Sequence, residues 1–144
     1  MREFQISIDI HAPPERVWPI MADLERWSEW TPSISGIEVL DGKPAGLGSQ
    51  VRVRQPKLLP ATFTITEWKP DRGFKWVSHS LGLVAVGNHV IEPGQTGSKV
   101  TLTLRFLGLL GGLAGFLGRN LIFRYIQLEA SGLKARSESD LASP

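Results

Sequence analysis

The sequence predicts an α+β fold, in which a curved antiparallel seven-stranded sheet wraps around one long C-terminal helix and two short helices separate the first two strands. Apolar and polar residues alternate with a period of two over most of the chain, which is typical of strands with one buried face. After Gly108 the period changes to that of an α-helix. With 144 residues, the chain has the length of one domain, which we expect to span residues 1–144.

The expected elements follow in order from these periods. Residues 4–10 alternate cleanly and form the first strand, which Pro13 and Pro14 end. Short turn sequences such as Lys69–Gly73 and Glu92–Gly97 join the later strands, as in an antiparallel meander. The expected strands are 4–10, 37–39, 50–55, 62–66, 74–79, 87–91 and 99–106, and the expected helices are 15–22, 24–30 and 118–139.

The length and width of the last helix predict a cavity between this helix and the sheet. Gly111, Gly112, Gly115 and Gly118 weaken its start, since each costs about 1 kcal/mol relative to alanine, so we expect the firm helix from Gly118 to Ser139. At about 1.5 Å per residue, such a helix is roughly 30 Å long and crosses the sheet. One helix is narrower than a seven-stranded sheet, and this helix-grip arrangement leaves a cavity between the two.

Five segments also carry a resemblance to a known family. They are IDIHAPPERVW (8–18), DLERWSEW (23–30), FKW (74–76), GSKVT (97–101), and Leu133-Lys134 with Glu138. These segments resemble, in order, the motifs of polyketide cyclase/dehydrase-like proteins in the START/Bet v1-like (SRPBCC) superfamily. The resemblance implies a deep hydrophobic cavity and a small apolar or aromatic ligand. It supplies no catalytic motif, because the superfamily spans lipid carriers, hormone receptors and aromatase/cyclases.

Side chains in the inward phase of the strands and the last helix are expected to line the cavity and bind the ligand. They are almost entirely apolar, and Trp76 is the tryptophan expected at the ligand, while the other four pack in the core. The expected ligand-binding residues are Phe63, Ile65, Phe74, Trp76, Ser78, His89, Ile91, Leu102, Leu104, Phe116, Arg119, Phe123 and Ile126.

Three polar side chains are candidates for catalysis. His89 shares the phase of Ile91, so its imidazole would orient a ligand carbonyl or act as an acid or base near neutral pH; alternatively, it is a hydrogen-bonded core histidine. Glu67 follows Ile65 in phase and points inward, unless a bulge at the strand end rotates it outward. Arg119 would fit an anionic ligand group, or it reaches back to water.

Two faces of the C-terminal helix carry apolar stripes. The stripe expected against the sheet contains Phe116, Arg119, Phe123, Ile126, Ala130 and Leu133. The other contains Leu110, Leu113, Leu117, Leu121 and Leu128, and Tyr125 falls toward this side and away from the cavity. An exposed leucine stripe predicts a homodimer contact through the C-terminal helix or a lid that docks on a membrane or partner; alternatively, its early part forms the cavity rim.

Composition narrows the remaining classes of function. The chain has no cysteine, and His11, His79 and His89 lack a metal-ligand spacing, so we expect no metal and no cofactor. No dense Lys/Arg cluster supports nucleic-acid binding. The most apolar segment, 106–117, is too short for a transmembrane helix, and the N-terminus lacks a signal-peptide pattern. We therefore expect a cytoplasmic protein.

Three functions remain compatible with the sequence. The first is a protein that binds a small hydrophobic or aromatic ligand in the internal cavity, which the sparse polarity of the expected lining favours. The second is a metal-free enzyme, a polyketide-type cyclase or dehydratase that uses His89, Arg119 and Glu67. The third is an interaction module that dimerises through the C-terminal helix, which predicts a filled core, so that a cavity above about 300 Å³ would argue against it.

Overall fold

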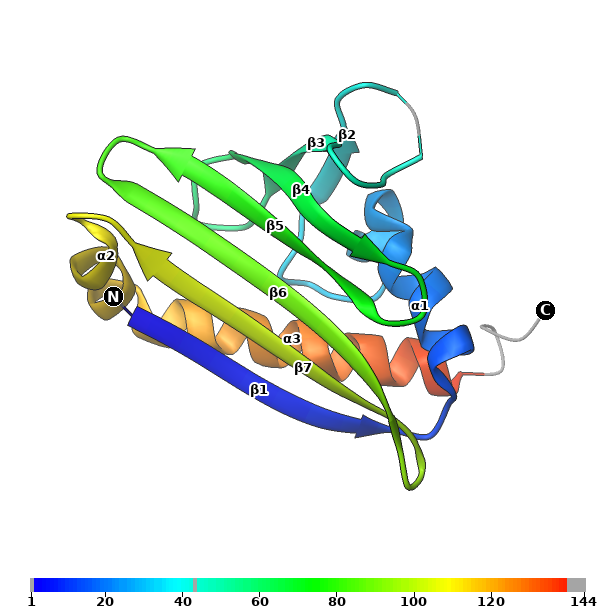
Figure 1. The fold of residues 1–144 in the computed structure, drawn as a ribbon. Helices are drawn as coiled ribbons and strands as arrows, with labels where there is room; N and C mark the ends of the chain where they lie inside the picture. The colour runs from blue at the N-terminus through cyan, green and yellow to red at the C-terminus, as the bar shows by residue number, and fades with distance from the viewer. Residues whose placement is uncertain (1, 43, 140–144) are drawn as a thin grey trace.

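The computed structural model describes residues 2–42 and 44–139, which form a seven-stranded antiparallel sheet (Figure 1). The strand order is β1-β7-β6-β5-β4-β3-β2, so that β1 pairs with β7 and the other strands pair with their neighbours in sequence. The elements are β1 (Arg2–Ile10), α1 (Pro14–Ala22), the 3-10 helix η1 (Leu24–Glu29), β2 (Gly36–Val39), β3 (Gln50–Arg54), β4 (Ala61–Lys69), β5 (Gly73–Ser80), β6 (Leu83–Gly94), β7 (Gly97–Leu107), α2 (Gly111–Leu117) and α3 (Arg119–Glu138).

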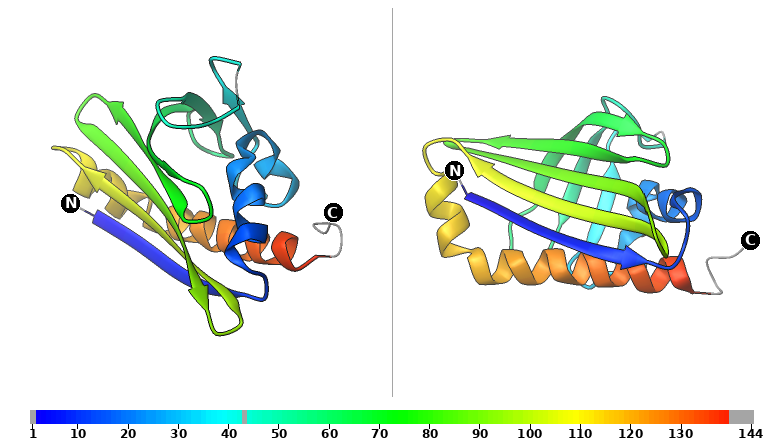
Figure 2. Two further views of the ribbon diagram at one scale, coloured as in Figure 1. Left: turned by 45° about the vertical axis from the view of Figure 1, so that its right-hand side comes forward. Right: turned by 60° about the horizontal axis from the view of Figure 1, so that its bottom comes forward.

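The sheet curves over α3, which runs along one of its faces (Figure 2). The short elements α1 and η1 connect β1 to β2 and lie at one end of the sheet, and α2 lies at the opposite end (Figures 1 and 2). The expected α+β helix-grip fold is therefore confirmed.

Several strands are longer than expected, and the largest differences lie in β6 and in the glycine-rich segment. β6 begins at Leu83 instead of residue 87, because a two-residue turn at Leu81 and Gly82 closes the β5–β6 hairpin, with Gly82 at a φ of +75°. The glycine-rich segment forms a separate helix, α2. Its glycines permit close packing, since a Cβ at Gly111 would lie 2.7 Å from the backbone of Phe106 in β7.

The apolar core fills the end of the sheet that holds η1. Trp27 of η1 is fully buried and donates its indole N–H to the carbonyl of Met21 at 2.9 Å. The centroid of its ring lies 6.1 Å from that of the Phe74 ring and 5.7 Å from that of the Trp76 ring, both on β5. Buried residues of α3 in this core, such as Leu133, belong to its C-terminal half.

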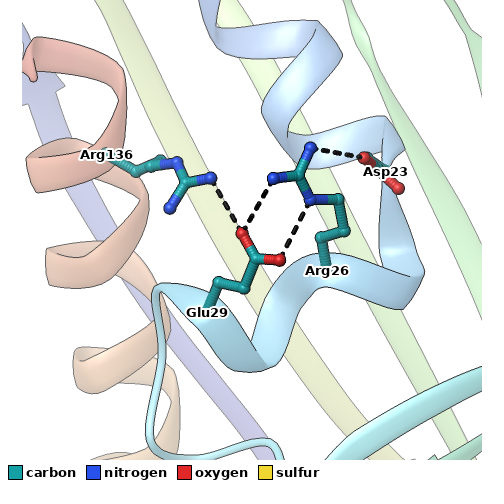
Figure 3. A network of polar contacts seen from close by, with 4 residues as sticks. All are labelled: Asp23, Arg26, Glu29 and Arg136. Carbon is teal, nitrogen blue, oxygen red and sulfur yellow. Dashed lines mark hydrogen bonds and ion pairs between the residues drawn. The ribbon is translucent and has the colours of Figure 1, made fainter. Parts of the chain in front are cut away.

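Polar contacts fasten this half of α3 to η1 (Figure 3). Arg136 of α3 donates to Glu29 of η1 at 2.9 Å, and Arg26 donates to both carboxylate oxygens of Glu29 at 3.0 and 3.1 Å. Hydrogen bonds from Arg26 and Arg136 lower the pKa of the Glu29 carboxyl. The backbones also approach closely, since a Cβ on Gly132 would lie 1.9 Å from the carbonyl oxygen of Trp30.

Further hydrogen bonds tie the same half of α3 to β1. Lys134 donates to the carbonyl of Asp9 at 2.7 Å, and Glu138 accepts from the backbone N–H of His11 at 2.8 Å. The hydrogen bond from His11 and a second one from Lys134 lower the pKa of the Glu138 carboxyl. The C-terminal half of α3 is thus fixed on two sides, by η1 and by β1.

Candidate functional site

A cavity of about 780 Å³ lies between the sheet and the N-terminal half of α3. Its walls come from residues 33–34 before β2, from β3, from the β3–β4 loop and from β4, β5, β6 and β7. On the helix side they come from Ile122, Tyr125, Ile126 and Glu129. The volume is in the range of pockets that hold small molecules. It also argues against the filled core that an interaction module would have.

Strand register explains how the sheet wall is built. Trp76, Gly87 and Leu104 form one cross-strand row over β5, β6 and β7, and all three line the cavity. Gly87 is required beside the Trp76 ring, because a Cβ there would lie 2.5 Å from its indole nitrogen. Phe63 of β4 packs on Trp76 with ring centroids 4.9 Å apart. Of the expected lining residues, Phe63, Trp76, Ser78, His89, Leu102, Leu104 and Ile126 line this cavity.

His89 lies where the cavity meets the aromatic core. Its ring stacks on that of Phe74, with centroids 4.1 Å apart and planes 9° apart, and stands at 89° to the ring of Trp76, with centroids 5.4 Å apart. Its Nδ1 lies 3.3 Å from the carbonyl oxygen of Phe74. These contacts fix the ring and leave Nε2 directed toward α3. His89 is thus a hydrogen-bonded core histidine that also lines the cavity, and its expected role toward a ligand stays a prediction.

Glu129 of α3 faces His89, although it was not among the residues expected from the sequence to line the cavity. Its Oε1 lies 3.8 Å from His89 Nε2, and the two side chains are only 15% and 5% exposed. This distance is too long for a direct hydrogen bond, so one polar ligand atom can contact both groups. A signal for Glu129 exists in the sequence, because a glutamate three residues after Ile126 and four before Leu133 falls on the buried face of the helix.

Tyr125 also lines the cavity, which corrects the expectation that it faces the outer leucine stripe. Its hydroxyl donates to the carbonyl of Pro56 in the β3–β4 loop. Together with Ile122, it shows that the cavity-facing side of α3 is rotated relative to the expected stripe. The hydrogen bond joins α3 to the loop that forms part of the cavity wall.

Glu67 points away from the cavity, and a bulge in β4 is the reason. Ile65 pairs with Trp76 and Glu67 with Lys75, so Thr66 is an extra residue that reverses the phase of the strand after it. Glu67 forms ion pairs with Lys75 at 3.0 Å and with Lys69 at 3.3 Å. Hydrogen bonds from these lysines, Lys75 first, lower its pKa. The inward orientation expected from strict alternation is wrong.

The expected inward orientation of Phe116, Arg119 and Phe123 is also wrong, because all three side chains are exposed. Phe116 belongs to α2, and the break at Gly118 ends the common helical face on which the expectation depended. The Arg119 guanidinium donates to the carbonyl of Phe116 at 2.7 Å and stacks over its ring at 4.3 Å. Arg119 was expected either to face an anionic ligand group or to reach back to water, and in the structure its side chain lies at the surface.

Three further expected lining residues lie behind the cavity wall. Ile65, Phe74 and Ile91 are almost completely buried in the aromatic and aliphatic core near η1. They have the inward phase that the alternation predicts, but at this end of the sheet the core fills the space under them. Phe74 instead supports the His89 ring from below.

Comparison with known proteins assigns the family. The model of the family described as "Polyketide cyclase / dehydrase and lipid transport" matches residues 1–138. The chain belongs to this family. Membership in this family agrees with the START/Bet v1-like resemblance of the sequence motifs. A comparison with curated protein sequences gives no significant match.

Solved structures share the fold of this family member. TTHA0849 from Thermus thermophilus is 24% identical, with a TM-score of 0.76 over 99% of this chain and 100% of its own. Ara h 8.0201 is 14% identical, with a TM-score of 0.69 over 94% and 97%. The di-domain ARO/CYC BexL from the BE-7585A biosynthetic pathway is 19% identical, with a TM-score of 0.74 over 100% of this chain and 48% of BexL. These similarities show the fold alone.

Two general features complete the description of this family member. Within residues 2–42 and 44–139, no group of three or more His, Asp and Glu side chains is placed to hold a metal ion. In the same part of the chain, no helix has the length and apolar character needed to span a membrane.

Proposed function

We propose that the protein binds a small hydrophobic or aromatic molecule that carries one polar group, in the cavity between the sheet and α3. The observation that carries this proposal is the cavity of about 780 Å³, in which a mainly apolar lining surrounds scattered polar side chains and in which His89 and Glu129 face each other at 3.8 Å. Pockets for small molecules have this composition, an apolar lining with few polar groups that fix orientation.

The apolar wall would supply most of the affinity. Phe63 and Trp76 both line the cavity with ring centroids 4.9 Å apart, and Leu102 and Leu104 continue the surface on β7. Burying apolar ligand surface contributes roughly 25 cal/mol per Å² before the cost of binding is subtracted. A flat aromatic ligand fits this wall because ring pairs gain further from offset or edge-on contact.

The polar pair would select the orientation of the ligand. Glu129 accepts hydrogen bonds when ionised, and His89 Nε2 donates or accepts depending on its tautomer. A ligand hydroxyl placed between Oε1 and Nε2 would satisfy both groups at the inner end of the cavity. The affinity of such a ligand should therefore exceed that of its analogue without the hydroxyl.

The first experiment tests whether the cavity binds an apolar aromatic molecule. The probe is N-phenyl-1-naphthylamine, whose fluorescence rises in apolar surroundings, titrated into the wild-type protein, Ala85→Phe and Val86→Phe. Ala85 lines the cavity, while Val86 is the next residue of β6 and has the opposite phase, so it is the matched control. We expect Ala85→Phe to weaken binding by about tenfold or more and Val86→Phe to leave it within about twofold. Equal binding by all three proteins would contradict the cavity as the site.

A second experiment tests the polar pair. The affinities of naphthalene and 1-naphthol are compared by calorimetry in the wild-type protein and in Glu129→Leu. A hydrogen bond to a charged group contributes about 1.5–3 kcal/mol, so the wild type should prefer 1-naphthol by about tenfold or more, and Glu129→Leu should lose this preference. The same preference in both proteins would show that Glu129 does not contact the ligand.

The pair of His89 and Glu129 also favours a second candidate function, a dehydratase or cyclase of the polyketide type. Both groups line one cavity at 3.8 Å from each other, which is the geometry of a general acid and base acting on one substrate. In a dehydration, one group removes the proton next to a carbonyl and the other protonates the leaving hydroxyl. A carbon–carbon double bond forms, and water leaves.

The test of this second function uses a β-hydroxyketone, the aldol adduct of benzaldehyde and acetone, whose dehydration yields a strongly absorbing enone. We expect enone formation with the wild-type protein and a loss of about a hundredfold in rate with Glu129→Gln. Tight naphthol binding without enone formation would exclude dehydration of this substrate and leave ligand binding as the function.

A further inference from the structure

Exposed leucines gather at the end of the sheet that holds α2. Leu59, Leu81, Leu109 and Leu117 are 89%, 98%, 96% and 71% exposed, which is unusual for side chains of this size. With Leu58 and Leu113, which are also exposed, we call them the leucine-rich end. They come from three separate segments: the β3–β4 loop, the β5–β6 turn, and the chain from the end of β7 through α2.

Hydrogen bonds join two of these segments to each other and the third to α3. The backbone N–H of Leu110 donates to the carbonyl of Gly82 at 2.7 Å, which joins the β5–β6 turn to the start of α2. The Tyr125 hydroxyl holds the β3–β4 loop at Pro56 against α3. The β5–β6 turn and α2 lie at the same end in both Figures 1 and 2, opposite α1 and the β6–β7 hairpin.

Basic side chains outnumber acidic ones at this end. The sequence has no Asp or Glu from Gly42 to Thr66, from Arg72 to Ile91 or from Pro93 to Leu128. The basic residues next to the exposed leucines are Lys57 in the β3–β4 loop, Arg119 directly after α2, and Arg2, whose side chain lies against Gly115 of α2. Arg105 on β7 and Arg124 on α3 belong to the neighbouring stretches of chain. Of the acidic residues described by the structure, Glu3 lies at this end, and it pairs with Arg105 at 3.5 Å.

We propose that the leucine-rich end docks on the surface of an anionic lipid bilayer. Leucines at the tips of three segments would enter the boundary between headgroups and acyl chains, while the arginines and the lysine around them meet lipid phosphate and carboxylate groups. No helix among the described residues can span a bilayer, so the protein would lie on the surface.

The charge pattern favours a lipid surface over a second copy of the chain. A symmetric contact through this end would bring the arginines of one copy against those of the other, and like charges oppose such a contact. An anionic bilayer complements these charges.

Docking would also place the cavity mouth at the lipid. Leu58 and Leu59 of the leucine-rich end line the cavity, as does Ile122 near the start of α3. An apolar ligand would then pass between bilayer and cavity with little exposure to water. The docking proposal goes beyond ligand binding, and it stands or fails on vesicle binding alone.

The test is co-sedimentation of the full chain with vesicles. Vesicles of phosphatidylcholine with about a third phosphatidylserine are compared with pure phosphatidylcholine vesicles, at low salt and at high salt. Each leucine that enters the bilayer should change partitioning by about tenfold, and each basic residue at the surface by roughly fivefold. We therefore expect strong binding to the anionic vesicles, weak binding to the neutral ones, and a marked loss of binding at high salt.

Two variants make the test specific. Leu109→Ser/Leu117→Ser should lower vesicle binding by about a hundredfold without loss of stability, because both side chains are exposed. Leu47→Ser is the matched control, since Leu47 is 72% exposed but lies in the β2–β3 loop at the other end, and it should bind as the wild type does. Equal loss in both variants would overturn the proposal.

A second outcome would also overturn it. If the wild type ignores vesicles but sediments as a dimer, and Leu109→Ser/Leu117→Ser is a monomer, the leucine-rich end is an interface between copies of the chain. Titration of each variant with N-phenyl-1-naphthylamine separates this question from the proposed ligand site. Probe binding that persists without vesicle binding would refute docking alone, and vesicle binding without probe binding would refute the cavity proposal alone.

Discussion

Replacing Gly132 with alanine should destabilise the protein, although alanine favours helix formation. Gly132 lies inside α3, where its Cα passes close to the backbone of Trp30 after η1. A Cβ at this position would lie 1.9 Å from the Trp30 carbonyl oxygen and 2.9 Å from its carbonyl carbon. Real Cβ contacts almost never fall below 3.0 Å, so α3 and η1 would have to separate by about 1 Å.

Two opposing effects determine the magnitude for Gly132→Ala. Alanine gains about 1 kcal/mol over glycine in a helix interior. Overpacking costs about 1–3 kcal/mol, and the upper value applies here because the neighbours are backbone atoms that cannot change rotamer. The free energy of unfolding should therefore fall by about 2 kcal/mol, and the melting temperature by about 8 °C for a chain of this size.

Urea denaturation followed by circular dichroism measures this change. Ser131→Ala is the matched control, because residue 131 is the exposed neighbour on the same helix and gains helix propensity without a clash. It should be stabilised by up to about 0.5 kcal/mol. A Gly132→Ala protein at least as stable as the wild type would refute the reasoning that close backbone contact sets the position of α3 over the cavity.

Three further predictions concern single side chains. Glu67→Gln should leave the affinity for N-phenyl-1-naphthylamine within about twofold, because this side chain faces away from the cavity; a larger change in the fluorescence titration would place it inside. Tyr125→Phe should lower the unfolding free energy by about 1 kcal/mol and speed amide exchange in the 55–60 loop, which loses its bond to the hydroxyl. The pKa of Glu138 is lowered, chiefly by the His11 N–H, so the stability that its carboxylate contributes is present above pH 4.5 and is lost as the pH falls through the lowered value. Glu138→Gln should accordingly show a smaller loss of melting temperature than the wild type between neutral pH and about pH 3, and an equal loss would contradict this assignment.

Alternation of polar and apolar residues predicted the strands well, because the sheet has one face against the core and the cavity. It failed after Ile65, since a single extra residue in β4 reverses the phase and no residue type in this stretch marks a bulge. It also missed the first part of β6, where the continuous apolar run from Leu83 to Val86 hides the period of two.

The helical side of the site was harder to predict. The prediction that Phe116 and Arg119 share one helical face required one continuous helix. In the structure, Gly118 separates α2 from α3. The rotation that brings Tyr125 and Glu129 to the cavity depends on how α3 crosses the curved sheet, which periodicity alone does not specify. The inward phase of β6 did place His89 correctly. Strand pairing determines which side chains of a strand face inward more strictly than apolar periodicity determines the rotation of a helix.

α3 is held more firmly at its C-terminal half than at its N-terminal half. Its C-terminal half is held by Glu29, Asp9 and the backbone of His11, whereas its N-terminal half spans the cavity. The N-terminal half is held by fewer contacts, among them the hydrogen bond from Tyr125 to the β3–β4 loop, so a small tilt about the C-terminal half produces its largest displacement near Ile122. We expect this tilt to accommodate ligands of different length while the aromatic packing around His89 stays unchanged. The cavity would then discriminate strongly between ligand groups at its inner end and weakly between those at its mouth.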